Sequence, residues 1–250
     1  PVIDNALAAG NPIPDELAPR AEVRRQALAN GTATREAAKP FPAAFQETES
    51  MGWIPEGWEV KKIGQILRSV SDTYPLKSVD EVIFLNTGDI LDGRFLHENF
   101  SRTDGLPGQA KKSIQKSDIL YSEIRPKNRR FAYVHFEGAQ HVVSTKLMVL
   151  RPTSDISSMF TYLILKRDST IDHLQMLAES RSGTFPQITF DILSKIEVAL
   201  PKKGGLVKAF TEKILQPTFE KQLKTDAATE TITKLRDTLL PKLISGQLRT

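Results

Sequence analysis

The feature that most constrains this chain is the stretch from residue 205 to residue 240, which has the apolar spacing of one long amphipathic helix. Apolar residues recur there every three to five positions: Leu206, Phe210, Ile214, Phe219, Leu223, Ala228, Ile232, Leu235 and Leu239. At about 1.5 Å per residue, such a helix would extend for roughly 50 Å. A single helix cannot bury its own apolar stripe, so a second element must cover it. Two interpretations follow: the helix packs on its own domain, or it protrudes and pairs with a partner helix.

Pro217 lies inside this stretch. Proline has no backbone N–H to donate, and its ring crowds the preceding turn. We therefore expect Pro217 to kink the helix or to divide it into two helices.

Length and composition place the chain among ordinary globular proteins. Its 250 residues, 40% hydrophobic and 26% charged, suffice for one medium domain with appendages or for two small domains. A formal charge of +4 is a weak indication of polyanion binding. The absence of cysteine excludes disulfides and thiolate chemistry, and it is compatible with a reducing cytoplasmic setting. No apolar run is long enough to predict a membrane span, and no signal peptide is recognisable.

Three regions are expected along the chain: an arm at 1–52, a globular domain at 53–203 and the long helix at 204–250. In the arm, residues 19–29 predict one short helix with Pro19 in its first turn and a stop at residues 30–31. An unfolded tail is the alternative for this arm. Trp53 and Trp58 flank turn-forming proline and glycine, which is typical of a domain edge.

The region from 58 to 201 alternates short β-like runs with turns. The predicted strands are 82–85, 119–121, 131–136, 142–143, 146–150 and 196–201. Residues 159–166 and 170–178 predict one or two helices, with Phe160, Leu163 and Ile164 on a shared face. Because the strands follow one another with few intervening helices, the expected fold class is α+β with a largely antiparallel or mixed sheet.

Catalytic motifs were sought and not found in the sequence. It contains no glycine-rich phosphate loop ending in Lys-Ser/Thr, no HExxH pair among its four histidines and no Gly-x-Ser-x-Gly elbow. Glu59-Val60-Lys61 has the form of a nuclease Glu-x-Lys, but the nearest upstream aspartate is Asp15 in the arm, which indicates a chance match. We therefore expect neither catalysis nor a metal site in this chain.

Basic residues in three loops are the candidate functional residues. Two lysines follow the turn at 104–108, a compact loop at 125–130 carries four cations, and a polar loop spans 179–187. Arginine and lysine can bind phosphates, while arginine and glutamine can also read guanine and adenine edges. The candidate DNA-binding residues are Lys111, Lys112, Arg125, Lys127, Asn128, Arg129, Arg130, Arg181, Ser182, Thr184 and Gln187. The alternative is that these loops are simply solvated.

A combination of motifs resembles a known family. The motifs are WIPEGW at 53–58, GDI at 88–90, KSDILYSEIRP at 116–126, GTFP at 183–186 and LRDTLLPKLISG at 235–246. Together they resemble the specificity subunit of type I restriction-modification systems over roughly residues 50 to 250. The opening PVID at 1–4 and the arm that follows also resemble the central spacer region of such subunits.

The resemblance implies an architecture. Complete members carry two target-recognition domains, each followed by a helix that the family conserves, and the two helices pack as an antiparallel coiled coil that separates the halves of a split DNA site. This chain has one such domain and one such helix, so it resembles the carboxy-terminal half of a subunit or a naturally shortened subunit. Pairing with a second half-subunit or a second copy could restore the coiled coil. The residues expected at that contact are Leu223, Ala228, Ile232, Leu235 and Leu239.

The resemblance also implies a function. The domain would recognise double-stranded DNA, and the helix and arm would bind modification subunits that hold S-adenosylmethionine and methylate adenine. Restriction subunits would join them and cleave DNA with ATP and Mg²⁺, so no cofactor is expected on this chain. The alternatives are an assembly protein that uses its long helix without specific DNA readout, and a stand-alone nuclease or methyltransferase, against which the motif search argues.

Overall fold

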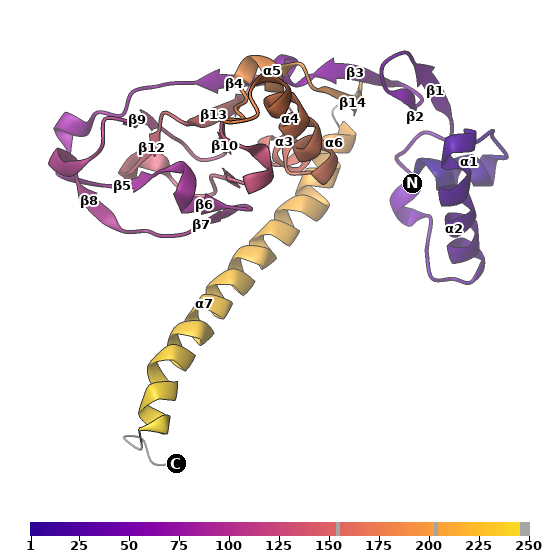
Figure 1. The fold of residues 1–250 in the computed structure, drawn as a ribbon. Helices are drawn as coiled ribbons and strands as arrows, with labels where there is room; N and C mark the ends of the chain where they lie inside the picture. Colours follow the sequence, from indigo (N-terminus) through magenta and orange to yellow (C-terminus); the bar gives the residue numbers. More distant parts are fainter. Residues whose placement is uncertain (154–155, 203–204, 246–250) are drawn as a thin grey trace. The chain divides into compact units, whose positions relative to one another are not determined.

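The computed structural model describes residues 1–153, 156–202 and 205–245, and it divides into one unit of Pro1–Val207 and a second of Lys208–Thr250. Figure 1 traces the chain through both units. Gly204, where the third region was expected to begin, and Gly246, the last residue of the C-terminal motif, lie outside the described residues.

The N-terminal region contains two helices, α1 (Val2–Ala9) and α2 (Ala18–Ala29), where the sequence predicts one. As predicted, α2 has proline in its first turn and is capped by Asn30. The additional helix, α1, ends at Gly10, whose φ of 69° is the left-handed conformation that favours glycine. The prediction of a single helix in the arm is therefore wrong.

A buried carboxylate joins these two helices. Asp4 is 1% exposed, and Arg24 donates to its two oxygens from Nε at 2.8 Å and from Nη2 at 2.7 Å. The hydrogen bond from Arg24 lowers the pKa of Asp4 below its usual value. Asn5 donates from Nδ2 to the carbonyls of Ala38 and Phe41 at 2.7 and 2.8 Å, which fixes the following segment against α1.

A hairpin connects this region to the main domain. β1 (Phe45–Thr48) pairs antiparallel with β2 (Gly52–Pro55), so the boundary expected between residues 52 and 53 falls within the hairpin. Gln46 links the hairpin to β3 (Trp58–Lys62), because its Nε2 donates to the carbonyl of Trp58 at 2.7 Å and its Oε1 accepts from the N–H of Gly57 at 3.1 Å.

Two four-stranded sheets form the main domain. The first is antiparallel, in the order β11 (Phe131–Tyr133), β10 (Ile119–Ser122), β13 (Leu147–Pro152), β4 (Leu67–Val70). The second is mixed, with β5 and β12 parallel, in the order β8 (Phe100–Arg102), β5 (Glu81–Leu85), β12 (His141–Ser144), β9 (Ala110–Ser113). The predicted α+β class with a mixed sheet is confirmed.

Two further strand pairs complete the domain. β6 (Ile90–Leu91) and β7 (Arg94–Phe95) form a hairpin, and β3 pairs antiparallel with β14 (Glu197–Pro201), which joins the two ends of the domain. All six predicted strands are present, but the run at 131–136 forms a strand only as far as Tyr133.

The antiparallel sheet is buried on both faces. Along β10, Ile119 and Tyr121 belong to one hydrophobic core, whereas Leu120 between them belongs to another. Successive side chains of a strand point to opposite faces, so the sheet separates two cores. This explains why its central strands are continuous apolar runs rather than alternating ones.

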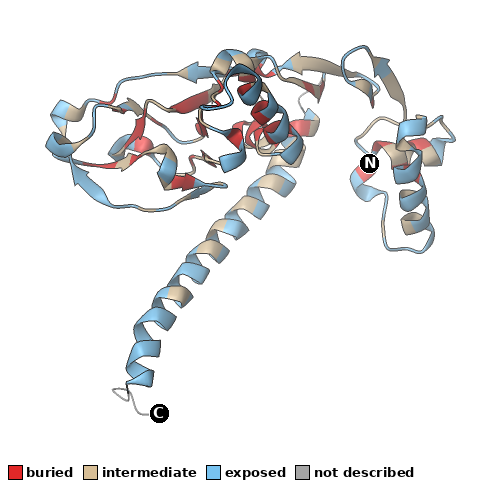
Figure 2. Ribbon diagram, viewed as in Figure 1, coloured by how far each residue is buried: buried red, intermediate tan, exposed pale blue. Residues whose placement is uncertain are grey.

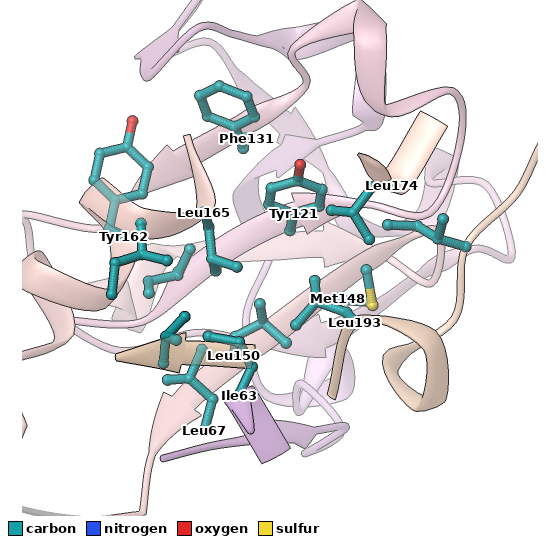
Figure 3. Close-up of a cluster of buried hydrophobic side chains, with 14 of the residues drawn as sticks. Ile63, Leu67, Tyr121, Phe131, Met148, Leu150, Tyr162, Leu165, Leu174 and Leu193 are labelled. Atoms are coloured by element: carbon teal, nitrogen blue, oxygen red, sulfur yellow. The ribbon is translucent and has the colours of Figure 1, made fainter. Parts of the chain in front are cut away.

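Three helices contribute to the first core: α3 (Ser158–Leu165), α4 (Asp168–Arg181) and α5 (Phe190–Ser194). Figure 3 shows Tyr162 and Leu165 of α3 among the side chains of this cluster. The face predicted for α3 is partly wrong, because Phe160 and Leu163 are only half-buried while Ile164 is buried. Nearly every residue of this short helix is apolar, so spacing alone could not select its inner face.

A buried ion pair ties three segments of the domain together. Asp118 is fully buried before β10, and Arg151 of β13 donates to its two oxygens from Nε at 2.8 Å and from Nη2 at 2.9 Å. Arg151 also donates from Nη1 at 3.2 Å to Asp72, which lies between β4 and β5. The second carboxylate oxygen of Asp118 accepts the N–H of Gln115 at 2.9 Å as well. Asp118 therefore accepts three hydrogen bonds inside the protein, two of them from Arg151.

The C-terminal helix is interrupted near the predicted place. α6 (Gly205–Phe210) is followed by a π-helical turn (Thr211–Leu215) and then by α7 (Gln216–Ile244). The π turn ends just before Pro217, so the residue that cannot donate a hydrogen bond lies where the hydrogen-bond pattern changes. α7 then continues through Pro241 to Ile244, four residues beyond the predicted end at Leu240.

The apolar stripe of α7 is uncovered. Within α7, all of which is described, no residue is buried (Figure 2), and Ile232, Leu235 and Leu239 are 66%, 54% and 42% exposed. Leu223 is half-buried and Ala228 is exposed. Within the described part of its own unit, α7 therefore has no other element that covers the stripe. Among the described residues, no helix is both long and apolar enough to span a membrane.

Removing the buried carboxylate with Asp118→Ala is expected to lower the free energy of unfolding by about 3 kcal/mol, because Arg151 then keeps a charge in the interior without its partner. Urea denaturation followed by circular dichroism would show a lower midpoint. Asp104→Ala is the matched control, since Asp104 forms an exposed pair with Arg102 at 2.9 Å and its loss should leave the midpoint nearly unchanged. Equal midpoints for the two variants would contradict the structural role of the buried pair.

Candidate nucleic-acid interface

The four-cation loop at 125–130 connects β10 to β11 through a 3-10 turn, Pro126–Asn128. Arg125 and Arg129, on either side of this turn, have left-handed φ values of 42° and 53°, a conformation that non-glycine residues seldom adopt. Hydrogen bonds hold the loop in this shape. The N–H of Arg125 donates to the carbonyl of Pro186 at 3.1 Å, and the N–H of Ser122 donates to the carbonyl of Arg130 at 2.8 Å. Backbone hydrogen bonds therefore hold both ends of this partly exposed loop to the domain.

The polar loop after α4 lies beside the four-cation loop. Nη2 of Arg125 is 3.4 Å from the carbonyl oxygen of Thr184, and Ile124 forms an isolated β-bridge with Gln187. Arg181, Ser182 and Thr184 are exposed, and Gln187 is half-buried. The fold thus brings together two of the three loops that the sequence singles out.

A small cleft is present in the second loop. It has a volume of about 290 Å³ and is lined by Arg181, Ser182, Phe185, Gln187 and Thr189. Phe185 is 54% exposed, which is unusual for an aromatic ring. Sequence reasoning overlooked this ring, although an aromatic residue between threonine and proline in a polar loop was a usable signal.

The cations of the first loop differ in how far the protein already neutralises them. Arg129 forms ion pairs with Asp168 of α4 and, at 3.6 Å, with Asp92 between β6 and β7. The bond to Asp168 raises the pKa of Arg129 further. Nζ of Lys127 lies 3.6 Å from Asp172 of α4. These two cations are bound by carboxylates of the same chain.

Arg130 has a structural position. Its Nη1 donates to the carbonyls of Gly88 and Ile90 at 3.0 and 2.9 Å, which fixes the start of the β6–β7 hairpin against β11. Arg125 and Arg181 differ from the other cations, because both are exposed and neither has a carboxylate partner among the residues that the structure describes. Asn128 is exposed at the tip of the same loop.

The two candidate lysines of β9 lie on the mixed sheet and differ from each other. Lys111 is exposed. Lys112 is half-buried, and its Nζ donates to the carbonyls of Thr145 and Leu147 at 3.0 and 2.8 Å. Burial lowers the pKa of Lys112, since the charged form loses hydration. Lys112 therefore links β9 to the start of β13.

No set of three or more histidine or acidic side chains that could hold a metal ion occurs within the described ranges. The arrangement of the site is that of a rigid, mildly cationic surface with hydrogen-bonding groups and one exposed ring.

This chain is similar to proteins of one known family. The family model for the type I restriction modification DNA specificity domain matches residues 55–214. The chain is 46% identical over 147 residues to the type I restriction enzyme HindI specificity subunit of Haemophilus influenzae, covering 58% of this chain and 32% of that protein. It is 24% identical over 209 residues to the type I restriction enzyme MjaIX specificity subunit of Methanocaldococcus jannaschii, covering 78% of this chain and 45% of that protein.

Solved structures share the fold. The HsdS subunit from Thermoanaerobacter tengcongensis matches with a TM-score of 0.56 at 18% identity, over 77% of this chain and 51% of that chain. A chain from a structure of complex assembly in a type I R-M system matches with a TM-score of 0.55 at 17% identity, over 76% of this chain and 50% of that chain. The chain therefore spans between a third and about half of the length of the proteins it matches.

The two lysines of β9 provide a test of their different surroundings. Lys112→Ala is expected to lower the free energy of unfolding by about 1–3 kcal/mol, because two inward carbonyls lose their donor. Lys111→Ala, one residue away and exposed, is the control and should leave the urea midpoint nearly unchanged. If the two variants unfolded at the same urea concentration, the structural role of Lys112 would be refuted.

Proposed function

Because the chain belongs to the family of type I restriction-modification DNA specificity domains, we propose that residues 53–203 recognise one half-site of a double-stranded DNA target. The observation that carries this proposal is the juxtaposition of the 125–130 and 181–187 loops, which places the exposed Arg125 and Arg181 beside the cleft at Phe185. An uncompensated guanidinium can bind a phosphate or read the guanine edge in the major groove. Gln187 has the bidentate amide that suits adenine.

In this proposal the chain directs chemistry that other subunits perform. Modification subunits would bind S-adenosylmethionine and methylate the DNA, and restriction subunits would bind ATP and Mg²⁺ and cleave it. The side chains at the site support a recognition role, since arginines, hydroxyls and an amide form hydrogen bonds to DNA without acting on it.

The single uncovered stripe of α7 supports a second element of the proposal. A C2 axis would set the stripe of one copy against that of another, and a separate half-subunit would cover it equally well. Either arrangement would supply the second helix of an antiparallel coiled coil and would hold two recognition domains at a fixed separation. Modification subunits would dock on the same helical region.

Replacing Arg125 or Arg181 with alanine in the complex with modification subunits is expected to weaken binding of the target duplex by about 1–3 kcal/mol, or about five- to 150-fold. Each change should also make the dependence of log affinity on log salt shallower by about 0.9 if the lost contact is a phosphate. Fluorescence anisotropy with excess competitor DNA measures both quantities.

Arg68→Ala, which removes an exposed arginine from β4, is the control for the loss of one charge. Target affinity and methylation pattern that stay at wild-type values in both loop variants would remove this surface from the recognition site. Binding that competitor DNA abolishes completely would favour an assembly protein without specific readout.

Introducing charge into the stripe with Ile232→Asp and Leu235→Asp together is expected to abolish self-association or binding of the modification subunit, because two carboxylates would have to be buried. Analytical ultracentrifugation of the chain alone and with the modification subunit measures both associations, and circular dichroism checks that the domain stays folded.

The control combines Ala227→Asp with Thr233→Asp, which adds the same charge away from the stripe and should leave association intact. Unchanged sedimentation of the Ile232/Leu235 variant would refute the proposed helix pairing. Methylome sequencing then distinguishes the two partners, since paired copies would methylate a split palindrome and a different half-subunit would give an asymmetric split site.

A further inference from the structure

One face of α4 is polar and lies against the four-cation loop. Asp168, Asp172, Gln175 and Glu179 are spaced by four, three and four residues, which places them on the same side of a helix. We call these four residues the α4 stripe. Oε1 of Gln175 accepts the N–H of Lys127 at 3.1 Å, and its Nε2 donates to Glu179 at 2.7 Å. The stripe is therefore an ordered surface that contacts the loop.

The carboxylates of the stripe neutralise the loop. Asp168 is hydrogen-bonded to Arg129, and Asp172 lies 3.6 Å from Nζ of Lys127. Two carboxylates of the stripe therefore contact a loop that carries four cations. Asp92 adds a further carboxylate at 3.6 Å from Arg129. The loop that looks most basic in the sequence has little net charge in the fold.

These ion pairs contribute little to folding. Asp168 is 79% exposed and Asp172 is 65% exposed, and exposed pairs of this kind have small effects on stability. Their effect on DNA binding is expected to be larger. A cation held by a carboxylate is not available to neutralise a phosphate, and each neutralised phosphate contributes to the affinity and to its dependence on salt. The consequence of the α4 stripe is therefore expected in DNA binding rather than in stability.

Building on the proposed function, we propose that Asp168 and Asp172 are specificity-determining residues that hold Arg129 and Lys127 on the protein and away from the phosphates of non-target DNA. Non-target binding depends almost entirely on charge, and any mobile cation strengthens it. Target binding depends on fixed contacts, which Arg125 and Arg181 supply in the proposed interface. Holding Arg129 and Lys127 on α4 therefore lowers the affinity for non-target DNA more than the affinity for target DNA.

The test uses Asp168→Asn, Asp172→Asn and the double variant in the complex of the full chain with its modification subunit. A target duplex and a scrambled duplex of equal length are the probes. We expect affinity for the scrambled duplex to rise by about five- to tenfold per freed cation at 0.1 M salt, with a salt dependence steeper by about 0.9 for each. Affinity for the target duplex should rise less, so that the ratio of the two affinities falls.

Two controls separate this effect from a general change of charge. Asp104→Asn removes a carboxylate from an exposed pair with Arg102 on another part of the domain and should change both affinities by less than twofold. Asp168→Glu keeps the charge and should restore wild-type behaviour. In the background of Arg129→Ala, Asp168→Asn should have no further effect on the scrambled duplex.

The outcomes are distinct. If Asp168→Asn and Asp172→Asn matched Asp104→Asn, or if the gain persisted without Arg129, the role of the α4 stripe would be refuted while the proposed function stood. A wild-type complex that bound target and scrambled duplexes equally would instead overturn the proposed function, and with it any specificity role for the stripe.

Discussion

The antiparallel sheet β11-β10-β13-β4 has to be covered on both faces, and the other elements of the domain follow from that requirement. Its strands direct Ile119 and Tyr121 to one side and Leu120 to the other, so a covering layer on one face alone could not bury it. The helices α3 to α5 cover one face and the mixed sheet packs against the other. The connection from β10 to β11 is therefore anchored at both ends in buried strands, which lets it hold two arginines in the left-handed conformation.

Because the loop is anchored, its surface charge cannot be judged from its sequence alone. A count of cations predicts a strongly positive surface at 125–130, but Lys127 and Arg129 form ion pairs with carboxylates of the same domain, and Arg130 donates to two backbone carbonyls. The field that DNA meets depends on the charges left uncompensated. Arg125 and Arg181 come from segments far apart in the sequence and lie on two loops that contact each other. The candidate interface therefore contains fewer cations without a carboxylate partner than the composition of its loops indicates.

Local interactions could be predicted from the sequence, and interactions between residues far apart in the sequence could not. Strand and helix positions depend on local periodicity, and the apolar runs at β5, β10 and β13 identified those strands directly. The partners of the cations are distant: Arg129 and Asp168 are 39 residues apart, and Lys112 and Leu147 are 35 apart. Nothing local distinguishes Lys111 from Lys112. The additional helix α1 had local signals, since Val2 and Ala6 are four residues apart and Gly10 ends the helix, but the pairing of Asp4 with Arg24, 20 residues later, is not readable locally.

The C-terminal helix is the opposite case, because local periodicity predicts it and tertiary packing does not bury it. Periodicity predicted α7 as far as Leu240, yet none of its 29 residues is buried. Tertiary packing supplies most of the stability of helices in water, and propensity alone supplies little. The stripe at Ile232, Leu235 and Leu239 is exposed within this unit, so its contribution to stability depends on what packs against it. In the pairing proposed above, a twofold axis would supply a second stripe from the same sequence.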